Sequence, residues 1–369
     1  MNIDNSFLDS GSLICIGNNQ LLIGQGLRTW STLPQFSGPS RSINPSFYFP
    51  DFFLTAPNPW FTHVSSKEVS IDDLIHSIHA LIPQTPHLKP KLDWQNTYQP
   101  HFAQTFADLQ VRFTTDDPNK KLQKAVPFIF ETVQQSMDKS LLAWALTHLL
   151  NYARTQPVYL YGYWDQNQGI LGATPEILFS LEKDPNSSPS IIRTKAVAGT
   201  ARSPEQLNQL LDNPKERHEH QLVIDGINTS LQYFGKVIHG TTSVLDLPGL
   251  AHLVTPIEVH IHRHLPPVDY EAAVRALHPT PALGASPKHV GQQWLNNYQT
   301  LIDRRRFGAP VGFQTHDMSQ CYVAIRNIQW DRSSISIGAG CGVVPESQLN
   351  NEWHEIQAKI CAIKNMMGL

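Results

Sequence analysis

Short apolar runs with few residues between them dominate the middle of the chain, and they limit the fold more than any other feature. Four of these runs have the length and the β-branched or aromatic content of strands, at 158–164, 170–173, 177–181 and 191–195. Apolar residues at helical spacing precede them, at 70–82 and 137–152. The pattern therefore predicts a mixed α/β fold.

The two ends of the chain add further strands and helices. Near the N-terminus, apolar runs at 12–16 and 20–23 flank Gly17-Asn-Asn19, which predicts a hairpin. The segment 31–60 is rich in Pro, Ser and aromatic residues, and we expect irregular structure packed by its rings. The C-terminal part predicts three strands and a final helix, at 312–315, 322–330, 334–337 and 351–366.

Two consecutive helices are expected after the central strands, and the second carries acids. Ser203 can cap the first helix, and Pro214 ends it and begins the next. In the second helix, Glu216, Glu219 and His220 lie three and four residues apart beside the apolar face. A solvated charged face is the default interpretation, although an acid placed there could also reach a cavity.

The final helix repeats this arrangement. Glu352, Glu355 and Lys359 form a stripe beside its apolar face, and Glu355 and Lys359 have the spacing of an ordinary helix ion pair. Two helices from distant parts of a chain can nevertheless each direct one glutamate at a shared point. Two such carboxylates, completed by water and an anionic substrate, would form a Mg²⁺ site.

Composition limits the kinds of partner. The 369 residues are 41% hydrophobic and 16% charged, enough for one large domain or two ordinary ones with a sizeable core. The formal net charge is −3 without a block of like charges, so we expect no nucleic acid and no membrane as a partner, but a small molecule. We expect a monomer or a weak homodimer.

Apolar runs and cysteines indicate the compartment. No apolar run approaches the roughly 18 residues of a transmembrane helix. The four cysteines lack the spacing of a disulfide framework or of a zinc site, and they are Cys15, Cys321, Cys341 and Cys361. We therefore expect a cytoplasmic protein.

Two glycine clusters are candidate anion sites. Ala198-Gly-Thr200 and Gly338-Ala-Gly-Cys-Gly342 each follow an expected strand, where missing side chains let backbone N–H groups approach a carboxylate. Neither matches a phosphate-binding loop, and an ordinary tight turn is the alternative.

Histidines suggest a competing zinc site. His260, His262 and His264 alternate, so they would share one face of a strand, and His218, His220 and His252 lie elsewhere in the same region. The chain has no H-E-x-x-H motif, and the same run fits an exposed strand that ends before two prolines. A zinc hydrolase stays open as an alternative on these residues.

Eight motifs follow one another along residues 122–369. They are Gly172-Ala-Thr-Pro-Glu176, Ala198-Gly-Thr200, Lys215-Glu-Arg-His-Glu-His220, His252-Leu-Val-Thr-Pro-Ile-Glu258, Leu277-His-Pro-Thr-Pro-Ala-Leu283, Val323-Ala-Ile-Arg326, Gly338-Ala-Gly-Cys-Gly342 and Glu352-Trp-His-Glu355. In this order they resemble the chorismate-utilising enzymes, which include the anthranilate, aminodeoxychorismate, isochorismate and salicylate synthases. Each motif alone is weak, and the ordered set is highly specific.

The resemblance implies a fold and a division of the chain. It implies the α/β (α+β) fold of anthranilate synthase component I, in which two large, mostly antiparallel sheets pack as a sandwich with helices outside and the active site in a cleft. Residues 1–110 would be an N-terminal β-rich portion of this fold, and residues 111–369 the chorismate-binding catalytic region.

The resemblance also implies roles for individual residues. Glu219 and Glu355 would hold Mg²⁺, which binds one carboxylate of chorismate. Glu176 would be the general acid that protonates the departing C4 hydroxyl, and Lys124, with Lys121 as the fallback, the base that activates water for attack at C2. The remaining substrate contacts would come from Arg326, Lys359, the backbone at Gly199 and Gly340, and the pocket residues Thr200, His252, Ala282 and Leu283.

Two segments favour one subfamily. Ala198 stands where aminodeoxychorismate synthases carry a nucleophilic lysine, and the segment from His278 to Leu283 looks like the isochorismate type. The resemblance thus implies an isochorismate synthase of the menaquinone or siderophore type. Salicylate synthase is the next alternative, followed by an anthranilate or aminodeoxychorismate synthase component and a chorismate-binding relative without catalysis.

The chain departs from the family pattern at two places near the expected site. Pro127 follows Lys124 closely, so the strand that carries this lysine must be an edge strand or be interrupted there. Gly338 stands where relatives commonly have an aromatic residue, which predicts a more open pocket wall.

Overall fold

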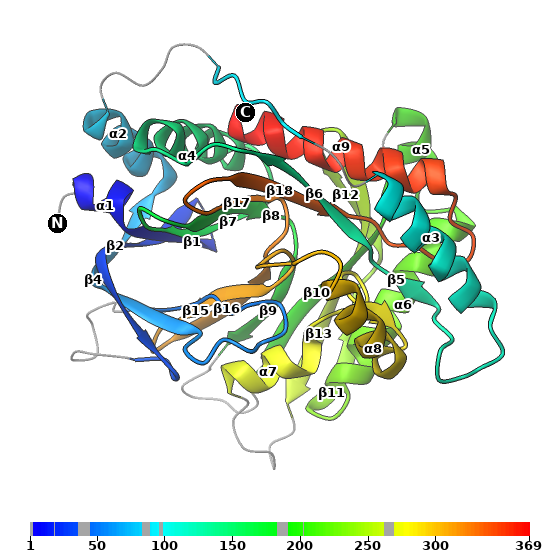
Figure 1. The fold of residues 1–369 in the computed structure, drawn as a ribbon. Coiled ribbons are helices and arrows are strands. Elements are labelled where there is room, and N and C mark those ends of the chain that lie inside the picture. Colours follow the sequence, from blue (N-terminus) through cyan, green and yellow to red (C-terminus); the bar gives the residue numbers. More distant parts are fainter. Residues whose placement is uncertain are drawn as a thin grey trace.

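The structure is a computed structural model, and it describes residues 3–17, 19–35, 45–82, 89–95, 99–182, 191–201, 203–261 and 269–369. Sixteen strands of these residues join into one hydrogen-bonded sheet, and every pairing in it is antiparallel. The sheet folds back on itself, so that its two halves face each other (Figure 1). The mixed α/β sandwich is therefore confirmed, and its two sheets are the halves of one continuous path.

The upper half in Figure 1 begins at the N-terminal hairpin. Its strands are, in spatial order, β1 (Gly11–Gly17), β7 (Tyr159–Trp164), β8 (Gly169–Thr174), β17 (Asn327–Trp330), β18 (Ile335–Gly340) and β6 (Phe128–Val133). The helices on this side are α1 (Asn5–Asp9), α2 (Ile71–Leu81), α3 (Gln99–Thr114), α4 (Lys139–Ala153) and α9 (Leu349–Met367). Their apolar faces and the outer face of this half form the largest core cluster.

The lower half carries the other helices. Its strands are, in spatial order, β15 (Pro310–Gln314), β16 (Met318–Val323), β9 (Ile177–Glu182), β10 (Ile191–Ala201), β13 (Leu250–Ile261) and β11 (Gly235–His239), with β12 (Ser243–Leu247) also paired to β13. Helices α6 (Pro214–Leu231) and α7 (Tyr270–Leu277) pack on its outer face in a second core. The short helix α5 (Pro204–Gln209) precedes α6.

Three strands join the halves along one side of the sandwich. They are β2 (Gln20–Ser31), β4 (Trp60–Ser70) and β3 (Ser46–Tyr48), and they complete the path from β1 to β15. A third core fills the space between the halves. In β1, Leu13 and Cys15 join the outer core while Ile14 joins the inner one, because successive side chains point to opposite faces of a strand. Burial on both faces explains the continuous apolar run there.

A separate two-stranded sheet lies beside the sandwich. It pairs β5 (Lys124–Ala125) with β14 (Ala285–Ser286), and α8 (Lys288–Gln299) follows β14. The chain leaves β5 at Val126 and Pro127 and resumes as β6, so the predicted interruption at this proline is confirmed.

Most of the predicted elements are present. The hairpin of β1 and β2 forms, with Gly17 opposite Gln20, and the helices predicted at 70–82, 137–152 and 351–366 are α2, α4 and α9. The single strand predicted at 322–330 is wrong, because the chain turns between β16 and β17. Part of the irregular segment predicted at 31–60 and two of the zinc-site histidines, His262 and His264, lie outside the described residues. The division at residue 110 stays a prediction.

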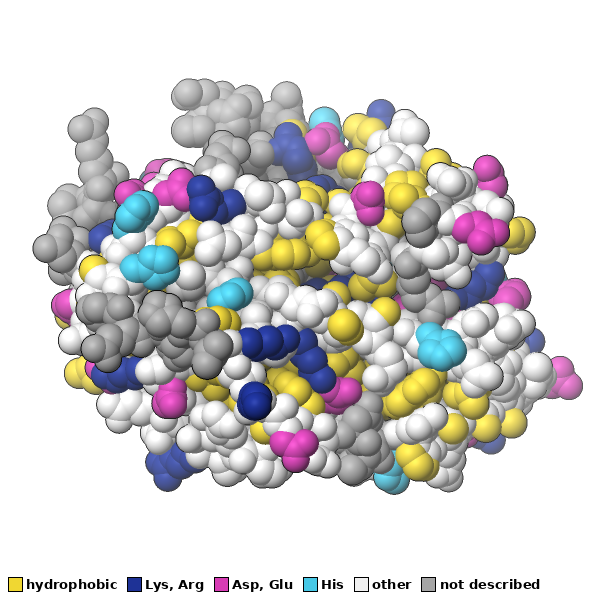
Figure 2. Space-filling model, turned by 90° about the horizontal axis from the view of Figure 1, so that it is seen from above, with side chains coloured by type: hydrophobic (Ala, Val, Ile, Leu, Met, Phe, Trp, Pro, Cys, Tyr) yellow, Lys and Arg dark blue, Asp and Glu magenta, His cyan; other side chains and the backbone are white. Residues whose placement is uncertain are grey.

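The described helices and the face drawn in Figure 2 give no sign of a membrane span or of one dominant charge. Within the described residues, no helix combines the length and the apolar character needed to cross a membrane. On the described part of the face in Figure 2, acidic and basic side chains are interspersed among polar and apolar ones.

Candidate active site

A cavity lies between the two halves of the sandwich, near α6 and α9. Its open volume, mouth included, is about 690 Å³. All the site residues predicted from the sequence line it: Lys124, Glu176, Gly199, Thr200, Glu219, His252, Ala282, Leu283, Arg326, Gly340, Glu355 and Lys359. Lys121, the fallback for the base, is exposed and does not line it.

Helix α6 brings one glutamate to the cavity because its polar stripe packs against β10. Asn213 caps the helix and Pro214 occupies its first turn. Val223, Ile227 and Leu231 anchor its apolar face in the core. The default interpretation of the acidic stripe as a solvated face is wrong, since Glu216, Glu219 and His220 are all buried.

Helix α9 supplies the second glutamate in the same way. Ile356, Ile360 and Ile363 are buried in the core of the upper half. Glu355 therefore projects into the cavity, where its Oε1 accepts a hydrogen bond from Lys359 Nζ at 2.7 Å. Glu352, one turn earlier, is 1% exposed.

The buried glutamates of α6 and α9 each have an ammonium partner. Lys124 Nζ lies 2.9 Å from Glu219 Oε1, with side chains 1% and 9% exposed. Lys215 Nζ lies 3.0 Å from Glu352 Oε1 and 3.1 Å from Glu216 Oε1. The second Glu216 oxygen accepts a hydrogen bond from Thr200 N at 2.7 Å. Buried charges of this kind are stable only when they are paired.

The paired carboxylates of α9 differ in proton affinity. Burial raises the pKa of Glu352, and the neighbouring carboxylate of Glu355 adds to this effect. Burial also works to raise the pKa of Glu355, but the ammonium groups of Lys359 and Lys215 outweigh it and hold that pKa below its usual value. Glu355 is therefore the more strongly anionic of the two.

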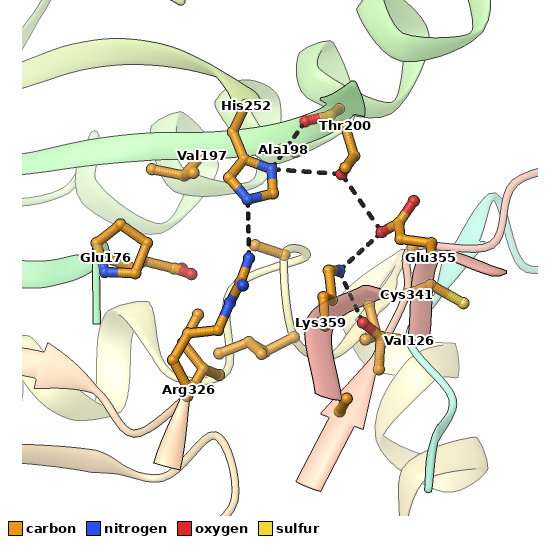
Figure 3. Close-up of a pocket in the computed structure, with 18 of the residues that line it drawn as sticks. Val126, Glu176, Val197, Ala198, Thr200, His252, Arg326, Cys341, Glu355 and Lys359 are labelled. Atoms are coloured by element: carbon orange, nitrogen blue, oxygen red, sulfur yellow. Dashed lines mark hydrogen bonds and ion pairs between the residues drawn. The ribbon is translucent and has the colours of Figure 1, made fainter. Parts of the chain in front are cut away.

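A hydrogen-bonded line crosses the cavity from Arg326 to Lys359 (Figure 3). Arg326 Nη2 donates to His252 Nε2 at 3.1 Å, and His252 Nδ1 donates to Gly199 O at 3.1 Å. Burial, with the nearby Arg326 and Lys359, lowers the pKa of His252 to about 3. The imidazole is therefore neutral, with its proton on Nδ1. Thr200 Oγ1 continues the line to Glu355 at 3.3 Å.

Glu176 lines the cavity between β8 and β9 and holds its proton more strongly than an ordinary glutamate. Burial raises its pKa to about 7, although Lys124 and Lys359 work against this rise. The side chain is buried, and its backbone N donates to Thr174 Oγ1. A carboxyl group that keeps its proton near neutral pH can serve as a general acid.

The oxygen donors of α6 and α9 suit a hard divalent cation. Mg²⁺ prefers oxygen ligands and commonly takes one or two carboxylates together with substrate groups and water. Gly342 leaves room for the carboxylate of Glu219, since a Cβ at this glycine would lie 2.0 Å from Glu219 Oε1. Glu352 Oε2 is buried without a hydrogen-bond partner among the described residues. The residues present therefore fit the cation that the resemblance implies.

A zinc site has no support in the described part of the chain. No three His, Cys, Asp or Glu side chains of the described residues converge to hold a metal ion. Both ring nitrogens of His252 are engaged, and His220 Nε2 contacts Thr255 Oγ1 at 2.8 Å. His260 lies beside Glu258 on β13.

Several cavity residues were not assigned from the sequence. Phe307, Ile363 and Gly342 line the cavity, and Lys215 and Glu216 line an adjoining pocket that shares Thr200 and Glu355 with it. The sequence places Glu216 in the acidic stripe of its helix, but it does not predict that this side chain is buried.

The pocket wall at Gly338 is closed. A Cβ at this glycine would lie 2.8 Å from both Phe130 and Phe307, so these two rings occupy the space that a larger side chain would need. The comparison with relatives, on which the expectation of a more open wall depends, stays a prediction.

Known proteins share both the sequence motifs and the fold. The sequence model of the family described as chorismate binding enzyme matches residues 61–368. The salicylate biosynthesis isochorismate synthase of Pseudomonas aeruginosa is 32% identical over 213 residues, which are 55% of this chain and 42% of that protein. Isochorismate synthase EntC of Escherichia coli is 32% identical over 210 residues, 54% of this chain and 51% of that protein. The match thus spans about half the length of these relatives.

The fold comparison covers nearly the whole chain. The structure of MenF, the menaquinone-specific isochorismate synthase from Escherichia coli, superposes with a TM-score of 0.71 at 17% identity, covering 97% of this chain and 88% of that chain. At this identity the likeness concerns the fold alone. With a family match over most of its length, a shared fold and the expected motifs around one cavity, the chain belongs to the family of chorismate-binding enzymes.

Proposed function

We propose that this protein is an isochorismate synthase that converts chorismate to isochorismate with Mg²⁺. The observation that carries the proposal is that a buried acid, Glu176, and a lysine, Lys124, line one cavity together with Arg326 and the carboxylates of Glu219 and Glu355. Relatives that are named isochorismate synthases support the same assignment. Ala198 at the cavity wall provides no amine nucleophile, which disfavours a covalent route through an enzyme lysine.

The cavity residues divide into binding groups and proton-transfer groups. Arg326 and Lys359 would bind the carboxylates of chorismate, because guanidinium and ammonium groups donate charge-assisted hydrogen bonds. Glu219 and Glu355 would hold Mg²⁺, which would add Lewis-acid binding of one substrate carboxylate. Apolar side chains such as Leu283, Phe307 and Ile363 would limit access of bulk water to the ring.

Proton transfer would use Lys124 and Glu176, which both line the cavity. Lys124, which is ion-paired with Glu219 in the structure, would first have to release a proton, and its Nζ would then accept one from a water molecule as the water oxygen forms a bond to C2. Glu176 would donate its proton to the C4 hydroxyl, which leaves as water while the ring double bond shifts. One water is thus consumed and one released, so the reaction is an isomerisation.

The test is product analysis with two matched lysine variants. Purified protein is incubated with chorismate and Mg²⁺, and the products are separated by chromatography, with Lys124→Ala and Lys121→Ala alongside. We expect isochorismate from the parent and from Lys121→Ala, a loss of at least about 100-fold for Lys124→Ala, and loss with EDTA that excess Mg²⁺ restores. Salicylate with pyruvate would instead indicate a salicylate synthase, and unchanged chorismate would refute the catalytic proposal.

A further inference from the structure

The backbone of Arg326 is held in an unusual conformation. Its φ is 56°, in the left-handed region that side chains other than glycine rarely adopt. The residue lies in the turn between β16 and β17, and its guanidinium lines the cavity. Such a conformation persists where the surroundings fix it, and it is often found at functional sites.

A buried side-chain relay fixes the two carbonyls that precede Arg326. Asn327 Nδ2 donates to Ala324 O at 2.7 Å and to the Tyr161 hydroxyl at 2.8 Å. Tyr161 in turn donates its hydroxyl hydrogen to Ile325 O at 2.8 Å. Tyr161 and Asn327 are both 0% exposed, so water cannot replace these bonds.

The neighbouring strand makes room for the relay. Gly172 of β8 lies directly opposite both Tyr161 of β7 and Asn327 of β17. A Cβ at Gly172 would lie 2.6 Å from the tyrosine hydroxyl and 2.8 Å from Asn327 Cβ. The next residue, Ala173, donates its N–H to Arg326 O at 3.2 Å. Three strands therefore converge on one turn.

The guanidinium presented by this turn is available to a ligand. Among the described residues, no acid forms an ion pair with Arg326, and its guanidinium donates a hydrogen bond to the neutral His252. Because the backbone and the imidazole fix the direction of the guanidinium, a carboxylate that binds it is fixed as well.

We propose that Tyr161 and Asn327 are positioning residues that hold Arg326 in the orientation that binds a carboxylate of the substrate. The inference rests on the proposed function for the identity of the substrate. The relay itself depends only on the hydrogen bonds of the turn and not on the identity of the substrate. Neither side chain lines the cavity, so both act through Arg326.

The experiment compares two tyrosines that each lose one buried hydroxyl. Tyr161→Phe removes the centre of the relay. Tyr270→Phe removes a hydroxyl that donates to Gln320 O at 3.0 Å, in a side chain 2% exposed that lies in the core around α7. Chorismate binding with Mg²⁺ is measured by calorimetry in a Glu176→Gln background, so that the substrate is not consumed. We expect about tenfold weaker binding for Tyr161→Phe and a change within about twofold for Tyr270→Phe.

Asn327→Ala tests whether the two residues act as one device. Asn327→Ala should weaken chorismate binding by a similar factor. The double variant should bind chorismate no more weakly than whichever single variant binds it more weakly, because both substitutions remove the same support. With Glu176 intact, the Tyr161→Phe variant should raise KM more than it lowers kcat. Equal effects of Tyr161→Phe and Tyr270→Phe on chorismate binding would overturn the proposal.

Hydrogen–deuterium exchange separates this inference from the proposed function. Amide exchange of the segment 323–330 should accelerate in Tyr161→Phe and stay unchanged in Tyr270→Phe, with or without substrate. Unchanged exchange in both variants would refute the relay itself. If the parent protein binds no chorismate, the proposed function fails, and the exchange result still decides the relay.

Discussion

The raised proton affinity of Glu176 makes a prediction that links the site to folding stability. The change is Glu176→Gln, which keeps the shape of the side chain and removes its titration. In the folded protein, burial raises the pKa of this carboxyl from 4.5 to about 7. In the unfolded chain the carboxyl has its ordinary pKa. The two states therefore bind this proton with different strength.

The pKa difference sets the size and the sign of the effect. Raising the pKa from 4.5 to about 7 corresponds to about 3 kcal/mol. Below pH 4.5 both states hold the proton, and the stability it contributes is fully present. Between pH 4.5 and 7 the unfolded chain loses the proton while the folded protein keeps it, so that contribution declines as the pH rises through the folded pKa. Relative to the glutamine variant, the parent should lose about 3 kcal/mol between pH 4 and pH 8.

The assay is urea unfolding of both proteins from pH 4 to pH 8 in the presence of EDTA. All other groups titrate alike in the two proteins, so the difference between their free energies of unfolding isolates Glu176. A difference that stays constant across this range would show that the carboxyl is not held in a dry environment, and the reasoning would be refuted. The same pKa implies that turnover falls as the pH rises above about 7, since the acid loses its proton.

Three further substitutions test the buried carboxylates of α6 and α9 and the proposed Mg²⁺ site. Lys124→Gln leaves the buried Glu219 unpaired, so thermal unfolding should show a loss of several kcal/mol that Mg²⁺ reverses more than in the parent. Gly342→Ala places a Cβ 2.0 Å from Glu219 Oε1. It should weaken the binding of Mn²⁺, measured by electron paramagnetic resonance, by about tenfold or more. An unchanged Mn²⁺ affinity would exclude Glu219 as a ligand. Lys215→Met removes the ammonium group that pairs with Glu352 and should lower Tm in the presence of EDTA. An unaltered melting curve would contradict a stabilising role of that ion pair.

Local patterns predicted many of the elements, and they failed where tertiary packing decides. The helices α2, α4 and α9 have clear apolar spacing and were found. Helix α3 was missed although Phe102, Phe106, Leu109 and Phe113 stand at helical spacing in it, a signal that was present in the sequence. Only the start of β2 was predicted and β4 was not, because the second half of β2 and the middle of β4 consist largely of polar residues.

The candidate site shows the same division. A polar stripe on a helix predicts solvent exposure on its own, and both stripes here are buried because β10 and β18 pack against α6 and α9. Only the ordered set of motifs indicated that Glu219 and Glu355 belong to one site. The relay of Tyr161 and Asn327 gave no signal, since the two residues are 166 positions apart and each resembles an ordinary strand residue.

The hydrogen bonds across the cavity also bear on how the protein reaches its fold. Lys124 and Glu219 are 95 positions apart, Arg326 and His252 are 74 apart, and Thr200 and Glu355 are 155 apart. Closing such long loops costs chain entropy before any contact repays it, so folding dominated by distant contacts is slow. The cavity can form only after both halves of the sheet have met. Ligands of the cavity therefore bind the completed fold, and their binding should slow unfolding of the whole chain.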